Sequence, residues 1–299
     1  MTGNGNIRIT ALVVALGLGF VASADAQGRP QMRNHTATEA KPLQLISASQ
    51  SLSSNRVSIT TSGNTRTIRA NGVPDHAVGR FPNRGNPNRI KAQSYTFKVS
   101  TNPTVGLATG MRRGGLFGVA VNGVPFDPGA AEFWMGNPRS GWQYEALGGA
   151  VRLGLDENYG HVQPTGAYHY HGLPVGLMQE LGWSSKAESP LIGYAADGFP
   201  IYAITAQVDG TVKKMQSSYR LKSGNRPGGS APSGDYDGTF VQDYAYVAGS
   251  GDLDQCNGGY VKTQDYPNGT YAYFLTESFP VVPRCLVGTA DRSFSKGRR

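Results

Sequence analysis

Cysteine and histidine are scarce in this chain of 299 residues, which contains two cysteines and five histidines. Neither Cys256 nor Cys285 has a histidine or a second cysteine at ligand spacing beside it, which argues against a metal site built on cysteine. Two cysteines near the C-terminus are expected to pair in a chain whose N-terminal sequence, described below, predicts export. We therefore predict one disulfide between Cys256 and Cys285.

The common catalytic motifs are also missing. The chain has no Gly-x-Ser-x-Gly phrase, no P-loop lysine motif and no His-Glu-x-x-His sequence. The chain therefore has none of the usual sequence motifs of serine hydrolases, nucleotide-binding enzymes or zinc proteases. No catalytic residue and no organic cofactor is predicted, and the sequence leaves open whether the protein is an enzyme.

A long apolar run occurs only near the N-terminus. Arg8 precedes the apolar residues 9–22, and Ala24-Asp25-Ala26 follows them, which is the order of a secretory signal peptide. We expect cleavage after Ala26. No later segment reaches the roughly 20 apolar residues that a membrane span needs. The sequence thus predicts a periplasmic or secreted protein with no transmembrane segment in its mature form.

Acidic residues are fewer than basic ones, with 20 Asp and Glu against 28 Lys and Arg, and the formal net charge is +8. Basic residues gather in residues 80–91 and in the C-terminal segment 293–299. An anionic polysaccharide or the cell envelope is one possible partner of such charge. The alternative is a basic exported protein with no partner of this kind. Nucleic acid is not expected, because the chain is exported and carries no nucleic-acid-binding motif.

Helical periodicity is rare, and short β-type segments dominate the chain. The one segment with helical spacing is 174–183, while 41 glycines and 18 prolines supply turns. We predict a disordered leader at 27–44, one loop-rich β domain at 45–292 and a basic tail at 293–299. The fold class is mainly β, with sandwich-like or irregular sheets. The predicted strands are 57–60, 65–70, 94–99, 116–121, 244–247 and 270–275.

No long repeat is apparent, but one short phrase recurs three times. It reads Asn/Asp-Gly, an apolar residue and Pro, at residues 71–76, 122–127 and 197–202. Asn-Gly and Asp-Gly favour tight turns with positive φ, and Pro makes the residue before it extended. Each phrase therefore predicts a turn that leads into a strand. His76 and Asp127 follow the Pro as possible ligands.

Three of the five histidines lie within residues 159–172, which read YGHVQPTGAYHYHG. On a strand, His169 and His171 point to one face because side chains alternate. The sequence from Gln163 to Gly166 suits a three-residue hairpin loop with a glycine bulge. That loop pairs His161 with His169 and places all three imidazoles on one face, whereas a four-residue loop shifts the register by one and removes His161.

Three imidazoles that converge are suited to a transition metal, with copper and zinc the main candidates. The alternative is that the histidines pack a sheet and bind no metal. A fourth ligand can come from His76 or from a carboxylate. The candidate carboxylates are Asp75, Asp156, Glu157 and Asp197.

Several phrases in order resemble the YHYH-domain family of exported proteins, which is named for Tyr168-His169-Tyr170-His171. The resemblance covers roughly residues 70–287. Its phrases are GAYHYHGLP (166–174), NGVPDH (71–76), YAADGFPIYA (194–203), GDLDQCNGGYV (251–261) and TYAYFLTESFPVVPRC (270–285). The resemblance implies a site formed by His76, His161, His169 and His171, with Asp197 nearby. It implies no reaction, because most members have no assigned activity.

Three functional hypotheses are compatible with these residues. The first is an exported protein that binds copper or zinc through the histidine cluster. The second is a metalloenzyme with an open coordination position at the same cluster. The third is a glycan-binding or envelope-binding module in which the histidines are structural.

Overall fold

The computed structural model describes residue 1 and residues 35–50, 52, 54–111 and 114–295. The described part from residue 35 onward does not include the predicted signal peptide (1–26), the leader residues 27–34 or the tail residues 296–299. The segments predicted as strands at 65–70 and 270–275 form β3 (Thr65–Ala70) and β18 (Thr270–Leu275) with those bounds. The predicted helix forms as α1 (Val175–Glu180). The mainly β fold class is confirmed.

An eight-stranded sheet forms the centre of the domain. Its order is β17-β18-β12-β11-β7-β8-β10-β9, with parallel pairing at β12–β18 and β8–β10 and antiparallel pairing elsewhere. The bounds of its other strands are β7 (Gly118–Ala120), β8 (Pro125–Phe126), β9 (Gly160–Val162), β10 (Tyr168–Tyr170), β11 (Gly193–Ala195), β12 (Pro200–Ala203) and β17 (Gly258–Val261).

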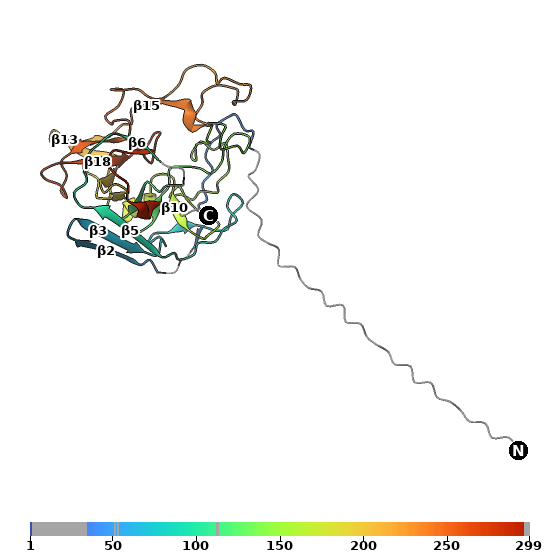
Figure 1. Cartoon of the computed structure of the whole chain (residues 1–299), viewed down its shortest axis with the longest axis horizontal. Helices are drawn as coiled ribbons and strands as arrows, with labels where there is room; N and C mark the ends of the chain where they lie inside the picture. The colour runs from blue at the N-terminus through green and yellow to red at the C-terminus, as the bar shows by residue number, and fades with distance from the viewer. Residues whose placement is uncertain (2–34, 51, 53, 112–113, 296–299) are drawn as a thin grey trace. The chain divides into compact units, whose positions relative to one another are not determined.

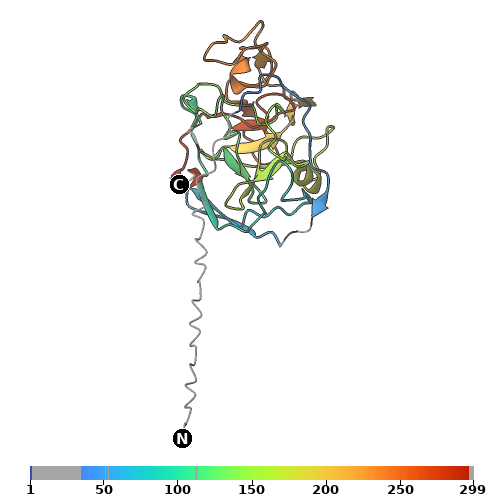
Figure 2. The same ribbon diagram turned by 90° about the vertical axis from the view of Figure 1, so that its right-hand side faces the viewer.

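Smaller sheets flank the central one. The three-stranded sheet β2-β3-β5 lies at one end of the domain and the β15–β16 pair at the opposite end (Figures 1 and 2). The remaining pairs are β1–β4, β6–β19 and β13–β14. The bounds are β1 (Ser49–Gln50), β2 (Val57–Ser62), β4 (Val78–Gly79), β5 (Tyr95–Ser100), β6 (Thr109–Gly110), β13 (Thr205–Val208), β14 (Thr211–Lys214), β15 (Tyr219–Leu221), β16 (Tyr244–Tyr246) and β19 (Cys285–Leu286), with 3-10 turns η1 (Val241–Asp243) and η2 (Arg292–Phe294).

Aromatic side chains on the central strands form the main hydrophobic core. Tyr168 and Tyr170 of β10 are buried against Phe81 and Phe126, and Tyr273 of β18 packs edge-on against another core aromatic ring. Burial of such rings supplies most of the apolar area that stabilises a β domain of this kind. The tyrosine face of β10 is therefore held rigidly in the core, which fixes where its opposite face points.

Ordered packing extends beyond the 45–292 boundaries that the composition predicts. Tyr144 donates a hydrogen bond to the carbonyl of Ala37 at 2.8 Å, and the amide of Lys41 donates to Gly148 at 3.1 Å. Phe294 of η2 is buried and stacks on Phe97. Ala37 and Leu43 also pack against the core cluster that contains Tyr144. In the described part of the chain no helix has the length and apolar character to cross a bilayer.

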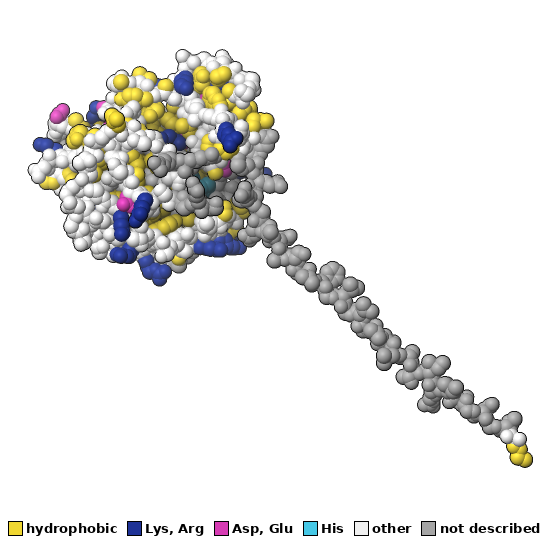
Figure 3. Space-filling view, viewed as in Figure 1, with side chains coloured by type: hydrophobic (Ala, Val, Ile, Leu, Met, Phe, Trp, Pro, Cys, Tyr) yellow, Lys and Arg dark blue, Asp and Glu magenta, His cyan; other side chains and the backbone are white. Residues whose placement is uncertain are grey.

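Basic side chains are distributed over the surface. On the face in Figure 3, Lys and Arg side chains form several separate groups. One continuous basic patch is what a long polyanion would need for many simultaneous contacts. This face offers no such patch, and polysaccharide binding stays a prediction.

The predicted disulfide is present. Cys256 and Cys285 are bonded, with their Cα atoms 5.1 Å apart. The bond joins the start of the β17–β18 hairpin to β19 across 29 residues of sequence. It therefore closes the loop that contains strands β17 and β18 of the central sheet.

Removing this bond is expected to destabilise the protein measurably. A closed loop of this length lowers the entropy of the unfolded chain, which corresponds to about 3–4 kcal/mol of unfolding free energy. We expect the double variant Cys256→Ala/Cys285→Ala to lose about that amount in urea unfolding. Reduced wild-type protein is the matched control and should unfold at the midpoint of the variant. Equal midpoints for the oxidised wild type and the variant would contradict this prediction.

Candidate metal centre

The β9–β10 hairpin has the register that the sequence predicts. The amide of Gln163 donates to the carbonyl of Ala167 at 2.9 Å, and the amide of Gly166 donates back to Gln163 at 2.8 Å. Gly166 has φ +89°, which only glycine adopts at little cost. His161 therefore lies opposite His169 in the ladder. The three-residue loop is confirmed and the alternative register is excluded.

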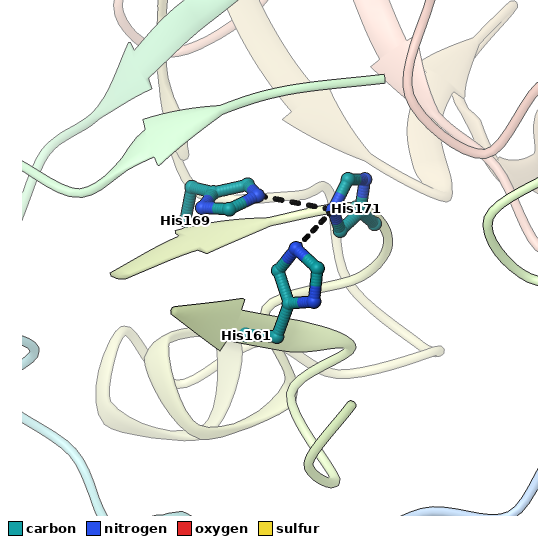
Figure 4. A group of neighbouring side chains, drawn as sticks. All are labelled: His161, His169 and His171. Atoms are coloured by element: carbon teal, nitrogen blue, oxygen red, sulfur yellow. Dashed lines mark hydrogen bonds between the residues drawn. The ribbon is translucent and has the colours of Figure 1, made fainter. Parts of the chain in front are cut away.

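The three imidazoles converge on one face of the hairpin (Figure 4). The Nε2 atom of His171 lies 3.0 Å from that of His169 and 3.1 Å from that of His161. Their ligand atoms all lie within 4.8 Å of one another, and no other such group of three or more is found among the residues that the structure describes. His169 and His171 are buried and His161 is half-buried. The cluster thus has one partly open side.

Backbone carbonyls orient two of the rings. Nδ1 of His161 lies 3.0 Å from the carbonyl oxygen of Leu153, and Nδ1 of His169 lies 3.3 Å from that of Ala167. A carbonyl oxygen only accepts, so each of these Nδ1 atoms carries the hydrogen. In the neutral ring Nε2 then has the lone pair. This is how imidazoles that bind a metal are usually held, with the second nitrogen bonded to the protein.

The two contacts at Nε2 of His171 cannot both be full hydrogen bonds. Nε2 of His171 faces two lone pairs, those of His161 and His169, and an imidazole nitrogen has one hydrogen or one lone pair. One hydrogen would have to serve both neighbours. A metal cation can accept all three lone pairs at once. Two nitrogens about 2.0–2.1 Å from one zinc ion in tetrahedral geometry are about 3.3–3.4 Å apart, so small ring rotations fit the site to an ion.

His76 lies on the other side of the hairpin. Its Nε2 is 2.6 Å from the hydroxyl of Tyr170, and its Nδ1 is 2.8 Å from the carbonyl of Ala77. Tyr170 points to the face opposite His169 and His171, because side chains alternate along β10. The structure therefore does not bring His76 to the three histidines, and we leave it out of the proposed site.

Asp197 is also separate from the cluster. Its Oδ2 accepts hydrogen bonds from the hydroxyl of Tyr273 and, at 2.9 Å, from the amide of Gly288. Its Oδ1 accepts from Phe199 at 3.4 Å, within the Asp-Gly turn. Burial raises the pKa of Asp197 above its ordinary value. Asp197 thus stabilises a turn in another part of the sheet.

The other candidate carboxylates have separate roles or places. Asp156 is fully buried and accepts bonds from backbone amides and from Tyr168, while Asp75 accepts from Asn122 and Glu157 is exposed. Among the described residues, Asp127 is the carboxylate beside the cluster, with its Oδ2 4.0 Å from Nε2 of His169. The recurring phrase indicated Asp127 as a possible ligand. The sequence analysis nevertheless chose its candidate carboxylates by proximity in sequence or turn position and did not include Asp127 among them.

Comparison with known families places this geometry in context. The sequence model of the family described as YHYH protein matches residues 96–288, more than half of the chain. This chain belongs to the YHYH protein family. The matched residues include the three clustered histidines and Asp127, whereas His76 lies outside them. The comparisons with curated proteins and with solved structures return no match.

Proposed function

We propose that this YHYH protein binds one transition-metal ion, copper or zinc, through Nε2 of His161, His169 and His171. The observation that supports the proposal is the convergence of three Nε2 atoms, with Nδ1 of two rings bonded to backbone carbonyls. Imidazole nitrogen is a ligand that copper and zinc share, whereas calcium and magnesium prefer oxygen.

We further propose that the protein acts outside the cytoplasm, after removal of residues 1–26. The disulfide between Cys256 and Cys285 supports this proposal, because such bonds persist in oxidising compartments. Outside the cytoplasm, copper or zinc would bind to a histidine site that is already folded. Storage, sensing or delivery of the metal is compatible with this location.

A metalloenzyme at the same cluster is the second candidate. Three histidine ligands leave a coordination position for water or substrate, and the half-buried His161 lies on the open side. Saturable metal content without turnover of ester, phosphate or redox substrates would favour the binding role. Turnover that depends on the bound metal would favour the enzyme.

Metal content tests the proposal directly. We expect mature protein, purified from the periplasm without an affinity tag, to carry near-stoichiometric copper or zinc by elemental mass spectrometry. The variant His161→Ala should carry far less, because two imidazoles remain. His35→Ala is the matched control, since His35 contacts Tyr144 instead of the cluster. A folded wild type that stays metal-free after incubation with Cu²⁺ and Zn²⁺ would overturn the proposal.

A further inference from the structure

The central sheet contains two copies of one structural unit. Its strand order is β17-β18-β12-β11 followed by β7-β8-β10-β9. From each edge of the sheet inward, a half consists of a hairpin (β17–β18 or β9–β10), a strand parallel to the inner hairpin strand (β12 or β8) and a central strand (β11 or β7). The two halves meet where β7 and β11 pair antiparallel. The register there pairs Gly118 with Ala195, Val119 with Tyr194 and Ala120 with Gly193. Exchanging the halves leaves this register unchanged, as an approximate two-fold axis requires.

Backbone hydrogen bonds repeat in the two halves. The amide of Val121 donates to Ile192 at 2.9 Å, and its counterpart Ala196 donates to Phe117 at 2.8 Å. The turns repeat as well, since residues 122–127 and 197–202 are two of the three recurring phrases and occupy equivalent places. The third phrase, which contains His76, has no such counterpart in the sheet.

The two hairpins share an acidic anchor, which is buried at Asp156 and half-buried at Asp254. Asp156 accepts a hydrogen bond from the hydroxyl of Tyr168 at 2.8 Å, and Asp254 accepts one from Tyr271 at 2.9 Å. Each carboxylate also accepts bonds from the amides two and four residues further along the chain. The amide of His171 donates to Tyr159 at 2.8 Å, and the equivalent bond at β18 is 2.9 Å long. The frame around the histidines therefore occurs twice.

The metal-site positions differ between the copies while the frame stays the same. The second copy has no histidine at any of them. Three of its four side chains belong to one apolar cluster, and the fourth is a glycine. The equivalent pairs are His161 with Gly259, His169 with Ala272, His171 with Phe274 and Asp127 with Tyr202. The first copy thus has histidine or aspartate at all four positions and the second copy has neither residue at any of them.

Asp127 points to the histidine side of the sheet. Phe126 lies beside Tyr170 in the parallel β8–β10 pair, and the amide of Asp127 donates to the carbonyl of Tyr170 at 2.9 Å. The next residue on each strand faces the opposite way, so Asp127 shares the face of His171. Its side chain is 8% exposed, and Oδ1 accepts from the amide of Gly129 at 3.3 Å. Oδ2 is the atom that lies 4.0 Å from Nε2 of His169.

We propose that Asp127 is the carboxylate of this metal centre and makes it select a divalent ion, Zn²⁺ or Cu²⁺, over Cu⁺. The proposal rests on the proposed function, since it assigns specificity to the same site. A buried carboxylate offsets part of the positive charge of a bound divalent ion, so the net charge of the site is lower. It is also a hard oxygen donor. Cu⁺ has one charge and prefers soft ligands, so it gains less from Asp127.

The variant Asp127→Asn tests this inference. Asparagine keeps the shape of the side chain and an oxygen for the amide of Gly129, and it removes the charge. We expect the affinities for Zn²⁺ and Cu²⁺, measured by competition with chromogenic chelators, to fall about 10–100-fold or more. The affinity for Cu⁺, measured with a Cu⁺-specific chelator, should fall by a much smaller factor. Asp75→Asn is the matched control, because Asp75 is exposed and bonds to Asn122.

The outcomes separate this inference from the proposed function. If His161→Ala loses metal and Asp127→Asn binds Zn²⁺ and Cu²⁺ as the wild type does, the histidine site stands and the role of Asp127 is wrong. An equal loss of Cu⁺ and divalent affinity would also overturn the selectivity. If the wild type binds no metal, both proposals fail. Asp127→Ser provides the same comparison if the asparagine variant does not fold.

Discussion

Replacing His169 by Ala and His171 by Phe is expected to abolish metal binding while the protein stays folded. These are the residues that the second copy of the structural unit carries at the same positions, Ala272 and Phe274, and both are fully buried there. The frame that surrounds them is shared by both copies. A cost of at most about 1–3 kcal/mol is therefore expected for repacking the first copy.

Thermal unfolding with and without metal measures both effects. At a free metal concentration of about 100 times Kd, binding stabilises a folded protein by about 2.7 kcal/mol. The wild type should show this gain, and His169→Ala/His171→Phe should show none. Its far-ultraviolet circular dichroism should match that of the metal-free wild type.

His76→Gln is the matched control for this double variant. His76 contacts Tyr170 on the opposite face of the hairpin, so this variant should keep its metal and its stabilisation by metal. Near-stoichiometric metal in His169→Ala/His171→Phe would contradict the proposed ligands. Loss of metal in His76→Gln with an intact fold would mean that His76 takes part, as the sequence analysis expected.

The variant Asp156→Ala is expected to destabilise the protein by about 4 kcal/mol or more, because four donors lose their acceptor and each such loss costs about 1–3 kcal/mol. Asp156 is fully buried and accepts from the amides of Gly79, Asn158 and Gly160 and from the hydroxyl of Tyr168. These bonds hold β9, which carries His161. We therefore also expect a loss of about 10–100-fold in metal affinity.

Asp254→Ala is the matched control for this effect, because Asp254 anchors the equivalent hairpin, which has no histidines. Asp254 is partly exposed, so its replacement should cost less, about 1–3 kcal/mol in urea unfolding. Its metal affinity should equal that of the wild type. Equal losses of metal affinity in the two variants would show that general destabilisation, and not the hairpin, sets the affinity.

Local patterns predicted the hairpin because local chemistry determines it. The alternation of Tyr and His defines the two faces of β10, and the requirement for positive φ at Gly166 defines the loop length. Both depend on residues within a few positions of one another. The disulfide was predictable for a different reason, since two cysteines allow only one intramolecular pairing.

Contacts between distant segments were beyond such reasoning. The sequence analysis found no long repeat, because few side chains are shared between the two copies. What is shared is mostly backbone hydrogen bonding, together with glycines, prolines and the anchors Asp156 and Asp254. A backbone pattern tolerates many side chains, so a structural repeat can persist where a sequence repeat is hard to see.

The sequence by itself determined that three imidazoles share one face of a short hairpin in a YHYH protein of mainly β structure. Only the tertiary structure decided which other residues lie near them. Parallel pairing of β8 with β10 brings Asp127 to His169, while His76 reaches Tyr170 on the other face and Asp197 stabilises a turn in the second copy. Turn and strand geometry follow from neighbouring residues, whereas strand order depends on how the whole chain buries its apolar side chains.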